Sequence, residues 1–275
     1  MIGHPPRWQT AVVRVLLVAL YLLPLLWVVV TALKSNADVL RAPNSLVFRP
    51  TTTVLLDVVS SSWAPIVTSL QIAAITTLVV LVVGLPAAYA LATHRTPGWR
   101  RSVTVVLTAF LLLQMIPQPM TVIPLYSILA RWQLVDSLGG LVLADVALMT
   151  PFAVLILRPF VLAVPNALQE AAQIDGASRF RIFRSIYVPM LGNGVFTVGA
   201  VVFIITWGEF IYAINFLSDP ALATVSQVLA GQTSVYSTDW NRLMSLALVT
   251  SLPILVVFLI AQRRLVRGLA VGSVK

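Results

Sequence analysis

Six apolar stretches, each long enough to cross a lipid bilayer, dominate this chain. A transmembrane helix needs about 20 mostly apolar residues to cross a hydrocarbon core ~30 Å thick. A helix also pairs its own backbone N–H and C=O groups, which find no hydrogen-bond partner in hydrocarbon. We therefore predict an all-α integral membrane protein with about six transmembrane helices, at residues 11–33, 66–93, 103–129, 138–163, 194–217 and 243–262.

The composition indicates a membrane protein over the whole length of the chain. Of the 275 residues, 59% are hydrophobic and 10% are charged, and the mean hydropathy is +0.96. Soluble globular domains contain about 45–50% apolar and about 25% charged residues. The sequence shows no internal repeat and no low-complexity segment, so we expect a single transmembrane domain over residues 1–275.

The charged residues predict the orientation in the membrane. The 18 Lys and Arg residues exceed the 9 Asp and Glu residues, which gives a net charge of +9. With six spans, most of the basic residues fall on the side that holds both termini. Because cytoplasmic loops collect Lys and Arg, we expect both termini in the cytoplasm. The basic excess follows from topology, and since no basic-aromatic RNA-binding motif is present, we expect no nucleic acid partner.

Several kinds of chemistry lack the residues that they need. The chain has no Cys and only His4 and His94 as imidazoles, so disulfide, thiol and zinc chemistry are not expected. Its two lysines, Lys34 and Lys275, do not end a G-x-x-x-x-G-K-[ST] phosphate-binding loop. We expect no metal or cofactor bound by this chain, no enzymatic activity and no ATPase site of its own.

The third predicted span contains three closely spaced prolines, Pro117, Pro119 and Pro124. Each proline removes a backbone donor, so this helix must bend or break. Broken helices inside a membrane are tolerated where the backbone lies against protein or a water-filled cavity. The break is therefore either part of a pathway wall or a proline kink buried in the bundle.

The most polar stretch of the chain lies between the fourth and fifth spans. Asn166, with Gln169 three residues later, has the form of an N-terminal capping box, so we predict a short helix there. Gly176 can adopt the left-handed conformation that ends such a helix, and Ser178 can cap a second one. We predict a helix-turn-helix at the cytoplasmic face.

This stretch, residues 165–189, resembles the EAA loop of permease subunits of bacterial ATP-binding-cassette (ABC) importers. The similarity lies in Glu170-Ala171-Ala172, Asp175-Gly176-Ala177, Phe183, Ile186 and Pro189. Further segments narrow the resemblance to the MalG-like permeases of carbohydrate importers. They are residues 86–92, 207–210, 262–269 and 272–275.

The resemblance implies the type I ABC importer permease fold and a role as half of a pathway for a sugar or sugar-like solute. A second permease subunit completes such a pathway, and an extracytoplasmic solute-binding protein delivers the solute. ATP-binding subunits bind ATP and Mg and dock on the EAA loop. The implied location is the bacterial inner membrane, with lipid around the spans. The residues implied to couple to the ATPase are Glu170, Ala171, Ala172, Asp175, Gly176, Phe180 and Phe183.

Two acidic residues lie inside predicted spans, Asp145 in the fourth and Glu209 in the fifth. A charge at the bilayer centre costs roughly 2.5–3.5 kcal/mol or more unless it is paired, hydrated or neutralised, so both should face the bundle interior. There they either accept hydrogen bonds from sugar hydroxyl groups or bond to another helix or a partner subunit. The candidate pathway residues are Glu209, Trp207, Tyr212, Asp145, Gln114 and Gln118.

Two other functions compete with that of an ABC importer subunit. A secondary transporter would use Asp145 and Glu209 to carry a proton or another cation, but this leaves the polar segment at 165–189 without a role. A membrane-embedded enzyme would need a metal cluster or a nucleophile with its base, and the sequence presents neither pattern.

Overall fold

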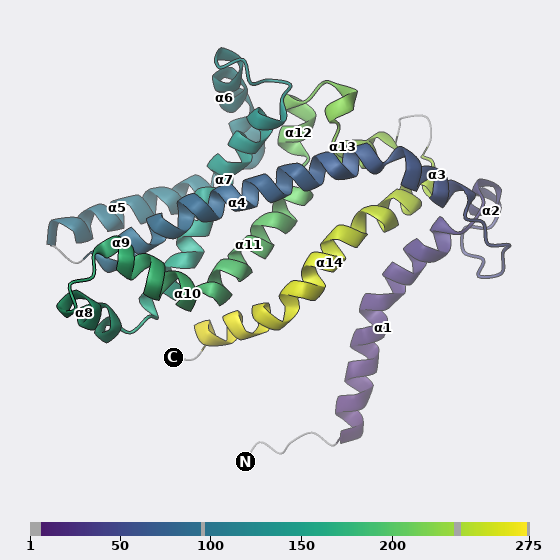
Figure 1. Ribbon diagram of the computed structural model, residues 1–275. Coiled ribbons are helices and arrows are strands. Elements are labelled where there is room, and N and C mark those ends of the chain that lie inside the picture. The colour runs from purple at the N-terminus through teal and green to yellow at the C-terminus, as the bar shows by residue number, and fades with distance from the viewer. Residues whose placement is uncertain (1–6, 95–96, 234–237, 274–275) are drawn as a thin grey trace. The chain divides into compact units, whose positions relative to one another are not determined.

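The computed structural model describes residues 7–94, 97–233 and 238–273, and these residues form helices without strands (Figure 1). Two bent pairs of helices and four single helices are long and apolar enough to cross a membrane. If each bent pair is one span, the number is six, as the sequence predicts. The second pair joins residues 179–190 to residues 192–207, so its first part includes residues that the sequence predicts outside the membrane. The four single helices are α1 (Arg7–Ala32), α4 (Trp63–Thr93), α7 (Leu138–Leu162) and α14 (Trp240–Ser273).

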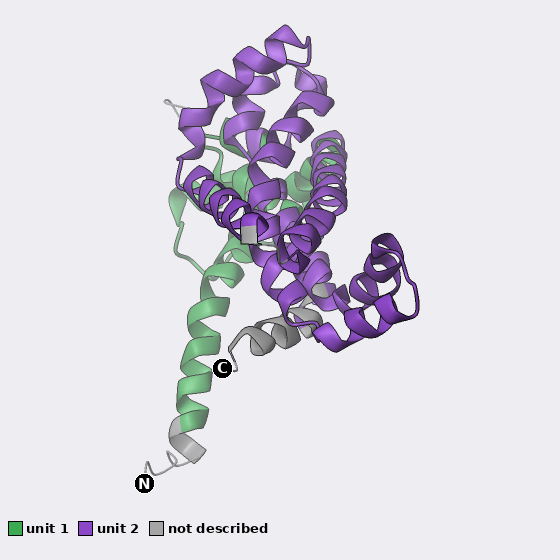
Figure 2. Ribbon diagram, turned by 90° about the vertical axis from the view of Figure 1, so that its left-hand side faces the viewer, with its two compact units in different colours: residues 1–63, 228–252 green, residues 64–227, 253–275 purple. Residues whose placement is uncertain are grey.

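The chain divides into two compact units (Figure 2). Unit 1 comprises residues 1–63 and 228–252, and unit 2 comprises residues 64–227 and 253–275. The boundary between the units falls inside α14. Every candidate site residue belongs to unit 2, so its architecture decides what the site looks like.

Unit 1 is organised around the end of α1, which is followed by α2 (Asn36–Arg41) and α3 (Thr53–Ser61). Lys34 is 1% exposed. Its Nζ donates to the carbonyl oxygen of Pro43 at 2.5 Å and lies 5.4 Å from the centroid of the Trp27 ring. Asn241 on α14 donates its side-chain amide to the carbonyl oxygen of Lys34. This bond satisfies a carbonyl group just beyond the end of α1, where the helix supplies no partner.

The core of unit 2 is built from α4, α5 (Pro97–Gln114), α7 and α11 (Gly192–Trp207). Small residues let these helices approach closely. A Cβ atom added at Gly84 on α4 would lie 3.5 Å from Ala153 on α7, and one added at Gly199 on α11 would lie 3.0 Å from Leu81 on α4. Lipid tails are as apolar as core side chains, so close packing of this kind drives helix association in a membrane.

The third span breaks where its prolines predict. α5 ends at Gln114, α6 (Gln118–Arg131) begins directly after Pro117, and the two helices are bent by 104°. Pro117 is the N-cap of α6 and Pro119 lies in its first turn, where the missing N–H removes no helical hydrogen bond. The predicted break is confirmed.

The fifth span breaks as well, which differs from the continuous helix expected over residues 194–217. α11 ends at Trp207 and α12 (Ile211–Phe216) begins after Phe210. Gly208, a poor helix former, lies in the break beside Glu209. Gly208 and Glu209 interrupt the apolar pattern here, but apolar residues on both sides made one continuous span the expectation. The short helices η2 (Pro220–Leu222) and α13 (Val225–Gly231) then lead towards α14.

Asp136, in the connection between α6 and α7, ties two loops together. Its φ of 57° is left-handed, and its own N–H donates to the carbonyl oxygen of Phe216 at 2.8 Å. Its Oδ1 accepts hydrogen bonds from the backbone N–H groups of Ser218 at 2.8 Å and Asp219 at 2.9 Å. These bonds favour the ionised carboxylate and lower the pKa of Asp136. The loop after α6 is thereby fixed to the segment after α12.

A pair of glycines on α11 tests the close packing in unit 2. A Cβ atom at Gly194 would lie 2.8 Å from Cγ of Phe160, whereas one at Gly192 would meet nothing within 4 Å. We expect Gly194→Ala to destabilise the protein by about 1–3 kcal/mol, because Phe160 Cγ lies too close to the backbone to move away. Gly192→Ala should change stability little, and thermal unfolding in detergent compares the two. Equal melting temperatures would contradict this packing.

Candidate functional site

The polar segment forms two short helical arms around a turn, as predicted. Figure 1 shows the segment at the end of unit 2 away from α6 and α12. The turn itself comprises residues 175–178, between the two arms. The helices in chain order are α8 (Asn166–Ile174), α9 (Arg179–Ile182), η1 (Phe183–Tyr187) and α10 (Val188–Met190).

The turn after α8 requires a glycine. Gly176 has a φ of +76°, a left-handed conformation that side chains with a Cβ atom disfavour. Its N–H donates to the carbonyl oxygen of Gln173 at 3.0 Å, and the N–H of Ala177 donates to that of Ala172 at 2.9 Å. This pair of bonds is the Schellman motif. Ser178 then caps α9, as predicted, by accepting a hydrogen bond from the N–H of Arg181 at 3.3 Å.

The predicted capping box at the start of α8 is wrong. The N-cap is Pro165, which has no side-chain acceptor, and the helix begins at Asn166. Gln169 instead turns towards η1, where its Oε1 accepts a hydrogen bond from the hydroxyl group of Tyr187 at 2.8 Å. The polar spacing that resembles a capping box therefore serves to hold the two helical arms together.

Tyr187 anchors the polar segment to the core of unit 2. It is 1% exposed, and its ring lies edge-on to that of Tyr89 on α4, with centroids 4.7 Å apart. Phe183 also packs against Tyr89, at 5.0 Å. The sequence reasoning gave neither tyrosine a role. The signal for Tyr187 was present in the helical spacing of Phe180, Phe183 and Tyr187.

The structure separates the predicted coupling residues into two groups. Ala172 and Phe183 pack against the core of unit 2, so they fix the segment in place. The others leave most of their surface free for a partner, and Phe180 is 71% exposed. The exposed predicted residues are Glu170, Ala171, Asp175, Gly176 and Phe180.

A second candidate site is a cavity of about 350 Å³ between the two breaks. Gln118 at the start of α6, Asp145 on α7 and Thr206 on α11 line it, together with Glu209 in the fifth-span break. The tertiary structure thus brings together three of the six predicted pathway residues. We call this space the central cavity.

Glu209 caps α12 with both carboxylate oxygens. Oε1 accepts hydrogen bonds from the N–H of Tyr212 at 2.7 Å and from the side-chain amide of Gln118 at 3.0 Å, and Oε2 accepts one from the N–H of Ala213 at 2.9 Å. A helix N-terminus carries a partial positive charge that favours an anion. Glu209 was expected inside a continuous helix. It lies instead just before α12, and its carboxylate pairs with N–H groups in the first turn of that helix.

Asp145 differs from Glu209 because only Glu209 has hydrogen-bond partners on both carboxylate oxygens among the described residues. The residue is 2% exposed, and its Oδ2 has no hydrogen-bond partner among the described residues. The hydroxyl group of Thr206, on the same cavity, also lacks a partner there. A buried polar atom without a partner costs about 1–3 kcal/mol.

The other three predicted pathway residues do not line the central cavity. Trp207 is 4% exposed and stacks on Phe203, with ring centroids 6.1 Å apart. Tyr212 is 1% exposed, and its hydroxyl group lies 2.5 Å from that of Thr121. Gln114 donates its side-chain amide to the carbonyl oxygen of Leu148 at 2.9 Å. Gln114 thus bonds to Leu148, which lines the cavity, whereas Trp207 and Tyr212 are buried outside the cavity lining.

The chain is similar in sequence to known transport proteins. A family model described as binding-protein-dependent transport system inner membrane component matches residues 81–271. The trehalose transport system permease protein SugB of Mycobacterium tuberculosis is 33% identical over 271 residues, which cover 96% of each chain. The diacetylchitobiose uptake system permease protein DasC of Streptomyces coelicolor is 30% identical over 273 residues, covering 98% of this chain and 96% of the relative.

The backbone is similar to that of solved importers. One match is a chain from a bacterial ABC transporter involved in the import of the acidic polysaccharide alginate, with a TM-score of 0.77, 16% identity, and coverage of 96% of this chain and 99% of that one. A second is from the alginate transporter in complex with its pentasaccharide-bound periplasmic protein, with a TM-score of 0.60. At this identity the likeness shows a shared fold.

Replacing Glu209 by glutamine tests whether its carboxylate is a structural cap. Glutamine has one acceptor oxygen in place of two, so Glu209→Gln should lose one bond to α12, at a cost of about 1–3 kcal/mol. We expect a lower melting temperature and a lower yield of assembled protein. Asp145→Asn is the matched control and should keep the wild-type yield, because Oδ2 of Asp145 has no protein partner among the described residues. Equal yields for the two variants would contradict the capping role.

Proposed function

This chain belongs to the family of binding-protein-dependent transport system inner membrane components, and from this premise we propose its place in an ATP-driven importer. It is a multi-pass protein of the bacterial inner membrane. We propose that it forms half of a translocation pathway, with a second permease subunit as the other half. An extracytoplasmic solute-binding protein would deliver the solute to this pathway.

The exposed polar segment is the observation that carries this proposal. No residue of α8 is buried, yet the helix is tied to the core through Ala172 and through the bond between Gln169 and Tyr187. A helix that is exposed but rigidly attached can transmit a displacement from a bound protein to the spans. We propose that the ATP-binding subunit docks on α8 and on the turn at Gly176.

The energy for transport would come from that partner subunit. The sequence has no phosphate-binding loop of its own. We propose that ATP and Mg bind to the ATP-binding subunit, and that this chain is a transport subunit without an ATPase site.

The exposed surface of α1 supports assembly with other components of the membrane. Only 11% of the apolar window of this helix is buried within the chain. A helix that is apolar on every side needs lipid or another membrane helix around it. We propose that lipid and the second permease subunit cover α1.

We propose a sugar or sugar-like solute as the substrate. Relatives named for sugar transport include the trehalose and diacetylchitobiose permeases, and a sulfoquinovosyl glycerol permease from Agrobacterium fabrum is 29% identical over 99% of this chain. Asp145 and Thr206 line the central cavity, and each has a side-chain oxygen without a hydrogen-bond partner among the described residues. A sugar hydroxyl group can donate to the carboxylate of Asp145, and it can donate to or accept from the hydroxyl group of Thr206.

The alternative of a proton- or cation-coupled secondary transporter is not favoured. The family depends on a binding protein, which such a transporter does not need. In addition, the carboxylate oxygens of Glu209 already accept hydrogen bonds from Gln118, Tyr212 and Ala213, so this group is part of the scaffold.

Substitutions at Gly176 test the coupling role. Gly176→Val places a β-branched residue at a φ of +76°, at a cost of about 1–3 kcal/mol, and should distort the turn. No neighbour lies within 4 Å of the added Cβ atom, so we expect normal membrane levels but no uptake and no solute-stimulated ATP hydrolysis. Gly176→Asn is the control, because Asn tolerates this conformation, and should retain more activity. Wild-type uptake with Gly176→Val would contradict the proposal.

Cysteine labelling tests the orientation on which docking depends. The chain has no Cys, so single introduced cysteines are labelled without background. In intact cells an impermeant thiol reagent should modify Ser45→Cys and Pro220→Cys but not Gly98→Cys or Ser178→Cys. Permeabilised cells serve as the control, and all four positions should react there. The reverse pattern would place α8 outside the cell, away from any cytoplasmic ATPase.

A further inference from the structure

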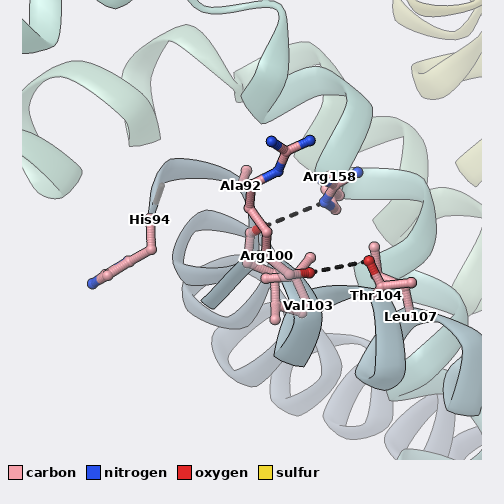
Figure 3. A pocket seen from close by; sticks show the side chains of 8 residues that line it. Ala92, His94, Arg100, Val103, Thr104, Leu107 and Arg158 are labelled. Carbon is pink, nitrogen blue, oxygen red and sulfur yellow. Dashed lines mark hydrogen bonds between the residues drawn. The ribbon is translucent and has the colours of Figure 1, made fainter. Parts of the chain in front are cut away.

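A second cavity, of about 520 Å³, lies where the end of α4 meets the beginning of α5 and the end of α7 (Figure 3). We call it the basic cavity. Its lining has a basic part and an apolar part, and it contains no acidic residue. The basic part consists of Arg100, Arg158 and His94. The apolar part consists of Leu91, Val103 and Leu107.

The two arginines of the basic cavity form no ion pair with any carboxylate in the part of the chain that the structure describes. Figure 3 shows their guanidinium groups on the same side of the cavity, although Arg100 comes from α5 and Arg158 from α7. The only ion pair among the described residues joins Arg242 to Asp57, in unit 1. Nε of Arg158 donates to the carbonyl oxygen of Leu91 at 3.4 Å. Two cations on one cavity repel each other unless an anion lies between them.

His94 links the basic cavity to the polar segment. Its Nε2 lies 2.6 Å from Nη1 of Arg179 on α9. Because a guanidinium group only donates, Nε2 of His94 is the acceptor of this bond. Arg179 adds a third guanidinium group close to the cavity. The positive charge therefore extends from the ends of the spans to the helix that follows the Gly176 turn.

Two features indicate that the basic cavity lies at the interface between the hydrocarbon core and water. Trp99, whose ring lies 5.0 Å from that of His94, is a residue type enriched at this level. Beyond the cavity, α5 exposes apolar side chains, such as Val105 at 61% and Leu111 at 55%. The charge distribution predicts that this end of unit 2 faces the cytoplasm, where the leaflet carries anionic lipids.

We propose that the basic cavity binds the phosphate headgroup of an anionic phospholipid, with Arg100 and Arg158 on the phosphate. The apolar lining of Leu91, Val103 and Leu107 contacts the start of the acyl chains. Guanidinium groups bind phosphate through paired charge-assisted hydrogen bonds. Free phosphate shares this chemistry but would leave the apolar half of the lining without a partner, so the observations favour the lipid.

Lipid binding to the purified, delipidated importer complex tests this site. Phosphatidylglycerol, phosphatidylcholine and inorganic phosphate are titrated separately, and binding is followed by native mass spectrometry and by the shift in melting temperature. We expect phosphatidylglycerol to bind and stabilise more strongly than the other two. Arg100→Gln and Arg158→Gln should each weaken its binding roughly fivefold. Arg131→Gln, an exposed position on α6, is the matched control and should bind like the wild type.

Three outcomes would overturn the proposal. Equal binding of phosphatidylcholine would show that charge is not recognised, and equal stabilisation by inorganic phosphate would assign the cavity to a soluble anion. Unchanged phosphatidylglycerol binding in Arg100→Gln would show that Arg100 does not contact the phosphate, which contradicts the proposed site. This variant is decisive even if Arg158→Gln fails to assemble, because Arg100 is exposed and has no ion pair among the described residues. The assay needs no uptake, so its result is independent of the solute and of the coupling role.

Discussion

Every backbone N–H and C=O group in a hydrocarbon environment needs a partner, and the two breaks of unit 2 are tolerated because such partners are present. At the fifth-span break, the carboxylate of Glu209 accepts the N–H groups of Tyr212 and Ala213. The hydroxyl group of Ser226 donates to the carbonyl oxygen of Glu209 at 2.5 Å. At the third-span break, backbone bonds serve instead: the N–H groups of Met115 and Ile116 donate to the carbonyl oxygens of Leu112 and Leu113. Without their bonds, both breaks would leave polar groups unsatisfied.

The two breaks also create the central cavity, since helices that run straight through would fill this space. One carboxylate on the cavity, Glu209, is committed to the scaffold. The other, on Asp145, has one oxygen without a hydrogen-bond partner among the described residues. This division gives the two acidic residues different roles that their similar surroundings in the sequence do not reveal.

At the other end of unit 2, the polar segment combines exposure with firm attachment. Tyr187 and Phe183 hold it on Tyr89 of α4, and the bond between Arg179 and His94 connects it to the basic cavity. Packed aromatic rings and a hydrogen bond thus connect the polar segment to the end of α4. The same region is where lipid and a cytoplasmic partner would meet.

The sequence by itself determined the helical membrane architecture, the break at Pro117 and the helix-turn-helix with Gly176 in its left-handed turn. Each follows from local physics: apolar length, a missing N–H, or the absence of a Cβ atom. Only the tertiary structure decided that Glu209 caps a helix, that Gln169 bonds to Tyr187, and that Trp207 and Tyr212 lie behind the cavity wall. Those roles depend on which distant segments meet. Periodicity along one helix carries no information about that, because in a membrane nearly every face of a helix is apolar.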